Sequence, residues 1–211
     1  IDGTGLPCTG ELALEDRWIL TRFERLTSEV TENIDRYELG VALSKLYDFV
    51  WDVFCDWYIE LVKPRLSSGD VNAQRVIVFV LSETLKLLHP FMPFITEEIW
   101  QSLPHDGESI MISAYPKYNE ELVFESDEQK MDRIIACIRA IRNRRAEMNV
   151  PPSKKAALYI VTADRDTFEA GSSFFGKLAS ASEVHVVDGY HADDAVQIVS
   201  DAATIYIPLA E

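Results

Sequence analysis

Apolar residues recur at helical spacing near the start of the chain. Between residues 12 and 37 they repeat every three or four positions, which is the period of one helical face. The residues of this stripe are Ile19, Phe23, Leu26, Val30, Ile34 and Tyr37. The pattern predicts a first helix over residues 12–37.

A second apolar segment begins near Glu38 and meets Pro64, where a helix is expected to stop. It is apolar almost all round, and such a helix is typical of the centre of a bundle. Its polar residues are four acidic side chains at four-residue spacing: Asp48, Asp52, Asp56 and Glu60. Neighbouring carboxylates repel one another unless compensated. They therefore face water, pair with arginines of another helix or, with ligands from elsewhere, hold a metal.

Three further helices are predicted before residue 150. One covers residues 70–89, and a short one covers residues 93–100 with a proline in the favoured first position. Ser126 and Gln129 have the spacing of a capping box, which predicts that a fifth helix opens there and ends near residue 149.

The pattern changes after Pro151 and Pro152. Short runs rich in β-branched residues predict four strands, and a weak helical pattern over residues 168–179 is interrupted by Gly171 and Gly176. The predicted strands cover residues 156–161, 184–187, 196–199 and 204–207.

The predicted fold class is therefore mainly α, a helical bundle followed by a small α+β appendage. We assign residues 1–10 to a linker, residues 11–150 to the bundle and residues 151–211 to the α+β subdomain. The first residue is not methionine and the last follows a strand-like run, so we expect the sequence to be part of a longer protein.

Composition fits a folded chain, because 47% of its 211 residues are apolar. The three cysteines, Cys8, Cys55 and Cys137, form no CxxC pair and predict neither a zinc site nor a disulfide framework. The longest apolar run, residues 76–81, is too short to span a bilayer, and no signal peptide is recognisable. These features predict a cytoplasmic protein without a membrane partner.

Charge is distributed unevenly along the chain. The formal net charge is -15, which taken alone disfavours binding to a polyanion. Residues 130–155, however, carry eight basic and two acidic residues, or +6, while the rest of the chain carries -21. The basic residues of this segment are Lys130, Arg133, Arg139, Arg142, Arg144, Arg145, Lys154 and Lys155. A basic block in an acidic chain indicates a local anion-binding surface.

A favourable interaction with the helix dipole explains one or two arginines at a helix C-terminus. Four arginines followed by two lysines are more than this interaction explains. The guanidinium group of arginine can donate two hydrogen bonds to phosphate oxygens, so the basic block favours binding to nucleic acid. The predicted backbone contacts are Arg139, Arg142, Arg144, Arg145, Lys154 and Lys155.

A second candidate surface lies on the first helix. Trp18 falls outside the apolar stripe and projects near Arg22, with Arg17 beside it in sequence. An aromatic ring among arginines can stack on an unpaired base. The alternative is that Trp18 packs against a neighbouring helix.

No motif for independent catalysis is present. The segment 171–177 has P-loop spacing, but Leu178 stands where the motif needs a magnesium-binding hydroxyl, so a short packed helix is favoured. The four histidines are scattered and none has zinc-protease spacing. We predict no catalytic residue and no metal ligand.

Several motifs resemble the anticodon-binding bundle of valyl-tRNA synthetases, which are class I aminoacyl-tRNA synthetases. The resemblance covers residues 11–160 well and the rest more loosely. The segments that carry it are residues 56–60 (Asp-Trp-Tyr-Ile-Glu), 63–66, 89–100 (His-Pro-Phe-Met-Pro-Phe-Ile-Thr-Glu-Glu-Ile-Trp), 109–111, 115–116 and 141–155.

The resemblance implies a non-catalytic module that binds the anticodon stem and loop of a valine tRNA. The HIGH and KMSKS signatures, which hold ATP in that family, do not occur here. ATP and Mg²⁺ would then act in a separate catalytic domain, and the module would be monomeric, with catalytic and editing domains as partners in the same chain. Two alternatives stay open, namely the same module of an isoleucyl enzyme and an acidic helical module that binds proteins.

Overall fold

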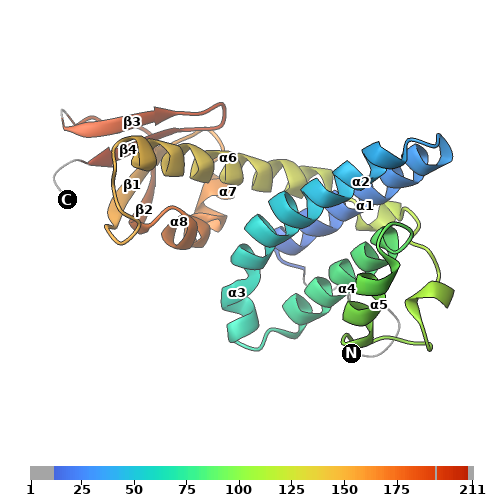
Figure 1. Cartoon of the computed structure of the whole chain (residues 1–211). Helices are drawn as coiled ribbons and strands as arrows, with labels where there is room; N and C mark the ends of the chain where they lie inside the picture. The colour runs from blue at the N-terminus through green and yellow to red at the C-terminus, as the bar shows by residue number, and fades with distance from the viewer. Residues whose placement is uncertain (1–11, 193, 209–211) are drawn as a thin grey trace. The chain divides into compact units, whose positions relative to one another are not determined.

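The computed structural model describes residues 12–192 and 194–208 (Figure 1). The predicted linker over residues 1–10 and Cys8 lie outside the described residues. The chain divides into two compact units, residues 1–128 and 129–211, which we call the first and second units. This division falls inside α6 (Glu125–Glu147), whereas the sequence placed it after residue 150.

The first unit is built from helices, as predicted. Its elements are α1 (Leu14–Asp35), α2 (Leu39–Asp48), the π-helical segment η1 (Phe49–Ile59), α3 (Glu60–Ser67), α4 (Val71–Leu88), α5 (Pro93–Gln101) and the short 3₁₀ turns η2 (Ile110–Ile112) and η3 (Glu120–Leu122). The first, third and fourth predicted helices are confirmed within two residues at each end. Asp70 caps α4 by accepting the Ala73 N–H at 3.1 Å, and Pro93 occupies the first helical position of α5.

The centre of this unit is α1, which packs against α2, η1, α4 and η3. Its buried residues include charged and hydroxyl side chains, so burial extends well beyond the predicted apolar stripe. The prediction that the second helix is central was wrong, because Tyr47 on α2 and Trp51 on η1 are more than half exposed. The central helix therefore buries polar side chains in addition to its apolar stripe.

The second predicted helix also continues past Pro64, which was expected to stop it. The segments α2, η1 and α3 follow one another without a break, and α3 ends at Ser67. Gly69, at φ +80°, donates to the Leu66 carbonyl, and Asp70 donates to the Arg65 carbonyl. This is a Schellman ending, for which glycine is the favoured residue. The stop signal is therefore Gly69 rather than the proline.

The predicted capping box at Ser126 was wrong. α6 begins at Glu125, which places Ser126 inside its first turn, and the Phe124 carbonyl already accepts the Glu128 N–H at 2.9 Å. The Phe124 N–H is bound by the hydroxyl of Thr21 on α1 at 2.8 Å. A tertiary contact therefore binds the N–H of the residue that precedes the helix.

The second unit joins the C-terminal part of α6 to a four-stranded sheet of order β2-β1-β4-β3 (Figure 1). Its other elements are β1 (Ala156–Val161), α7 (Arg165–Ala170), α8 (Ser172–Leu178), β2 (Ala181–Val187), β3 (Ala195–Val199) and β4 (Thr204–Pro208). The strand β1 pairs parallel with β2 and antiparallel with β4. All four predicted strands are confirmed, and the break at Gly171 separates α7 from α8, whereas Gly176 lies within α8.

The core of this unit lies between the helices and one face of the sheet. Leu158, Ile160 and Ile205 from the sheet and Phe168 and Phe175 from the short helices are fully buried. A side chain at Gly171 would place its Cβ 2.5 Å from Cδ1 of Ile134 on α6, so the helix passes closely over the α7–α8 junction. This packing fixes the C-terminal part of α6 within the second unit.

Candidate nucleic-acid interface

The C-terminal end of α6 is shaped by a Schellman motif. Val150 donates to the Arg145 carbonyl at 2.9 Å, and Asn149 donates to the Ala146 carbonyl at 3.0 Å. Asn149 has φ of 56°, in the left-handed region that asparagine tolerates better than most residues. The motif turns the chain away from the helix and into the loop that carries Lys154 and Lys155.

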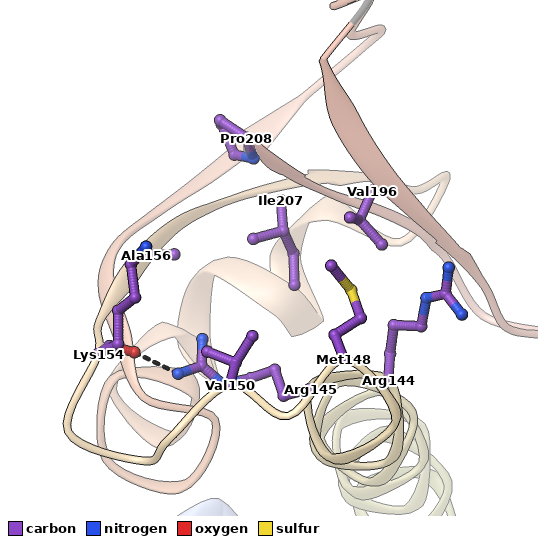
Figure 2. A pocket seen from close by; sticks show the side chains of 9 residues that line it. All are labelled: Arg144, Arg145, Met148, Val150, Lys154, Ala156, Val196, Ile207 and Pro208. Atoms are coloured by element: carbon purple, nitrogen blue, oxygen red, sulfur yellow. Dashed lines mark hydrogen bonds between the residues drawn. The ribbon is translucent and has the colours of Figure 1, made fainter. Parts of the chain in front are cut away.

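Arg145, one of the predicted contacts, is buried at 8% exposure. Its Nη2 donates to the Pro151 carbonyl at 3.2 Å and to the Lys154 carbonyl (Figure 2). The guanidinium therefore binds the backbone of the loop after α6, where it satisfies two carbonyls. Arg145 positions the loop lysines instead of presenting its own charge to a ligand.

The other predicted basic residues are exposed and lie on more than one side of α6. Arg142 faces α8, where its Nε donates to the Leu178 carbonyl at 2.6 Å. Arg144, which also forms an exposed ion pair with Glu147 at 3.0 Å, lines a small pocket together with Lys154. The predicted contacts therefore surround one helix end rather than form a single row.

The pocket between Arg144 and Lys154 has a volume of about 80 Å³. Figure 2 shows Ile207 facing Met148 and Val150 across the pocket, with Arg144 and Lys154 at opposite sides. Arg144 and Arg145 point in opposite directions from α6, although they are adjacent in sequence. The pocket is therefore apolar inside, with a cation on each of two sides.

Replacing Asn149 with alanine is expected to destabilise the second unit by about 1–2 kcal/mol, because alanine pays the full steric cost of the left-handed conformation. Glycine at the same position should leave stability equal or slightly higher. Scanning calorimetry of both variants measures the difference. Asn143→Ala, at an exposed position inside α6, is the control and should change little. Equal melting of the alanine and glycine variants would contradict the assignment.

The second candidate surface does not form as predicted. Trp18 is 3% exposed, so its ring is buried and unavailable for stacking on a base. Arg17 forms an ion pair with Asp127 at 3.1 Å, and Arg22 lies 3.8 Å from Glu128. Burial of Trp18 favours the packing alternative, and both arginines bind the start of α6.

The remaining candidates have structural explanations. The segment with P-loop spacing is the helix α8, and Asp48, Asp52 and Asp56 are exposed to water. Among the described residues, no group of three or more His, Cys, Asp or Glu side chains could hold a metal ion. Within the same part of the chain, no helix has the length and apolar character needed to cross a membrane.

Sequence reasoning missed two features of the first unit. One is a buried network around Arg65, and the other is a groove beside Tyr115 and Tyr118. Both tyrosines stand in a short segment without periodicity, and Arg65 stands in a motif to which no role was assigned. A loop holding two tyrosines around a proline and a lysine was the available signal for the groove.

A comparison with protein families finds the anticodon-binding domain of tRNA ligases over residues 16–160, which is more than half of the chain. The chain therefore belongs to the family of anticodon-binding domains of tRNA ligases.

Its curated relatives include valine–tRNA ligases. The enzyme of Clostridium acetobutylicum is 48% identical over 209 residues, which cover 95% of this chain and 24% of that ligase. The enzyme of Clostridium tetani is 48% identical over 93% of this chain and 23% of that ligase, and that of Oceanobacillus iheyensis is 42% identical over 95% and 24%. The chain spans about a quarter of the length of these relatives and matches their anticodon-binding part. The resemblance to valine–tRNA ligases is thus supported over the two alternatives, the module of an isoleucyl enzyme and an acidic helical module that binds proteins.

Proposed function

We propose that this chain binds the anticodon stem and loop of a valine tRNA through the basic surface around the C-terminal end of α6. The observation that carries the proposal is the exposed cations around this helix end: Arg139, Arg142, Arg144, Lys154 and Lys155. Membership of the anticodon-binding family and the names of the relatives support tRNA as the partner.

The surface works by neutralising phosphates. Arginine forks bind phosphate oxygens in pairs, and the lysines add point charges on the adjoining loop. Arg145 contributes indirectly, because its bonds to the loop carbonyls hold Lys154 in place. Such contacts position a nucleic acid without reading its sequence. Base recognition therefore needs a further site.

The rest of the reaction is assigned to other domains. We infer that the chain acts within a longer valine–tRNA ligase in the cytoplasm, as the lengths and names of its relatives suggest. Attachment of valine, which uses ATP and Mg²⁺ in this family, would then belong to catalytic and editing domains of the same ligase.

Removing one exposed cation should weaken tRNA binding and reduce its dependence on salt. Five phosphate contacts predict a slope of log K against log salt of about -3.5 to -4.5. Lys154→Ala should lower affinity by about 5- to 8-fold near 0.1 M salt and reduce the slope by about 0.7–0.9. Fluorescence anisotropy with a labelled valine tRNA at several salt concentrations measures both quantities, and Arg142→Ala should behave similarly.

The matched control is Lys63→Ala. Lys63 is an exposed lysine of α3 in the first unit, where it forms an ion pair with Glu60. Its removal should leave affinity and slope close to the original values. Equal losses in the Lys63 and Lys154 variants, or binding that does not change with salt, would count against the proposed surface.

A further inference from the structure

A groove in the first unit runs between the last turns of α1 and the segment 115–118, with a volume of about 570 Å³. Its floor is one face of α1, on which Ser28, Thr31 and Asp35 follow one another at helical spacing. Its wall carries Tyr115 and Tyr118. The volume lies within the range of about 300–1,000 Å³ that is typical of sites for small molecules.

Two backbone hydrogen bonds hold the segment that follows this wall, residues 119–124, against α1. The N–H of Asn119 donates to Oε2 of Glu24 at 2.7 Å, and the N–H of Phe124 donates to the hydroxyl of Thr21 at 2.8 Å. Pro116 is buried and adds a rigid residue to the wall. The C-terminal end of the wall is therefore anchored to α1, which lowers the entropic cost of ordering this segment around a ligand.

The two tyrosines present aromatic surface to the groove. Tyr115 is 38% exposed and Tyr118 is 50% exposed. Burial raises the pKa of Tyr115, so its hydroxyl stays protonated and can donate a hydrogen bond. Partly exposed aromatic rings at the edge of a preformed groove are suited to stacking on a flat ligand.

The charges of the groove discriminate between ligands. Arg36 forms an ion pair with Glu32, while Asp35 and Lys117 are exposed at the lining. The lining thus carries two acidic and two basic side chains, and the Asp35 carboxylate can accept hydrogen bonds from the amino group of a base. Lys117 can meanwhile balance the charge of an attached phosphate. Aromatic rings, acceptors and one lysine together fit a nucleotide.

We propose that this groove holds one unpaired nucleotide of the RNA that the chain binds, with its base stacked on the tyrosines and its amino edge near Asp35. The inference rests on the proposed function, because the nucleotide is part of the bound RNA. It adds a base-reading site to the phosphate contacts around α6, which carry no sequence information by themselves.

The test compares a hairpin RNA that has the valine anticodon stem and an unpaired loop with a fully paired duplex of the same stem. Tyr115→Ala and Tyr118→Ala should weaken hairpin binding by about 5- to 150-fold, which is the range of one lost base–aromatic stack. Binding to the duplex and the salt slope should stay unchanged, since no phosphate contact is removed. Anisotropy titrations with the 211-residue chain measure all three quantities.

Conservative variants separate stacking from folding. Tyr115→Phe and Tyr118→Phe keep the rings and should retain most of the hairpin affinity. Tyr47→Ala removes an exposed tyrosine of α2 in the same unit and should change nothing. Asp35→Asn, at an exposed position, should alter the preference among hairpins that differ in their loop bases. Thermal unfolding followed by tryptophan fluorescence verifies that each variant is folded.

The outcomes distinguish this inference from the proposed function. Salt-dependent hairpin binding that survives both alanine substitutions would overturn the groove and leave the phosphate surface standing. Failure of the original chain to bind the hairpin at any salt concentration would overturn both. Free nucleoside monophosphates are tested last, as competitors of the labelled hairpin. If they compete as strongly as the unlabelled hairpin does, RNA is ruled out as the source of the nucleotide.

Discussion

Replacing Arg65 with alanine is expected to lower the free energy of unfolding of the first unit by about 3–5 kcal/mol. The guanidinium Nη1 of Arg65 lies 2.9 Å from Glu15 and 2.7 Å from Asp16, and both carboxylates are buried. Without the cation, two adjacent carboxylates would remain in an environment from which water is excluded. Urea unfolding followed by tryptophan fluorescence measures the loss, because all four tryptophans belong to the first unit.

The network extends beyond these two pairs. Tyr58 donates its hydroxyl to Oδ1 of Asp16 at 2.9 Å, and burial, with Asp16 beside it, raises the pKa of Tyr58. Nε of Arg65 also binds Asp70, which caps α4, at 2.9 Å. Arg65 therefore connects α1, α3 and the start of α4, and its loss should loosen all three together.

Two comparisons make this expectation specific. Arg36→Ala removes an exposed arginine whose pair with Glu32 is worth only about 0.2–1 kcal/mol. In a chain that already carries Asp16→Asn, loss of Arg65 should cost clearly less, because one buried charge has gone. The role assigned to Arg65 would be wrong if its removal cost no more stability than removal of Arg36. It would also be wrong if the effects of Asp16→Asn and Arg65→Ala were additive.

Periodicity predicted the existence of the helices and strands well, because the apolar pattern directly reflects which faces are buried. The pattern failed at the centre of the bundle. α1 is central although it buries Asp16, Thr21 and Glu24, each of which has a partner from elsewhere in the chain. The hydrophobic pattern along the sequence predicts that such polar residues are exposed, because it does not show partners that are distant in sequence.

The same limitation affected the site. The basic block around residues 130–155 was visible in the sequence, because charge accumulates without regard to folding. Which cations are exposed was not, since Arg145 is buried by bonds to loop carbonyls that only the turn at Asn149 brings near. The burial of Trp18 was likewise not visible in the sequence.

Replacing Glu24 with glutamine is expected to stabilise the first unit at alkaline pH. Glu24 is 2% exposed, and its burial raises its pKa to about 7. The N–H of Asn119 lowers this pKa because it favours the charged form, and the nearby charge of Glu83 raises it. The facing groups are the Asn119 amide and Glu83, which is itself paired with Lys86 at 2.5 Å. Ionisation of Glu24 thus places a charge in a poorly hydrated site that holds the wall of the groove.

The direction of the effect follows from the two pKa values. The pKa of Glu24 in the folded chain lies above the ordinary value of 4.5, so folding favours the protonated form. The stability that this carboxyl contributes is complete below about pH 4.5 and is lost as the pH rises through about 7. A shift of this size corresponds to at most about 3 kcal/mol, at 1.36 kcal/mol for each pKa unit.

Glutamine keeps a carbonyl oxygen for the Asn119 N–H but cannot ionise. The variant should therefore exceed the original chain in stability by up to about 3 kcal/mol near pH 8.5, and the difference should fall toward zero near pH 4.5. Urea unfolding followed by tryptophan fluorescence at several pH values measures this difference, with Glu121→Gln, at an exposed position of η3, as the control. A constant difference across pH would show that Glu24 does not titrate in this range.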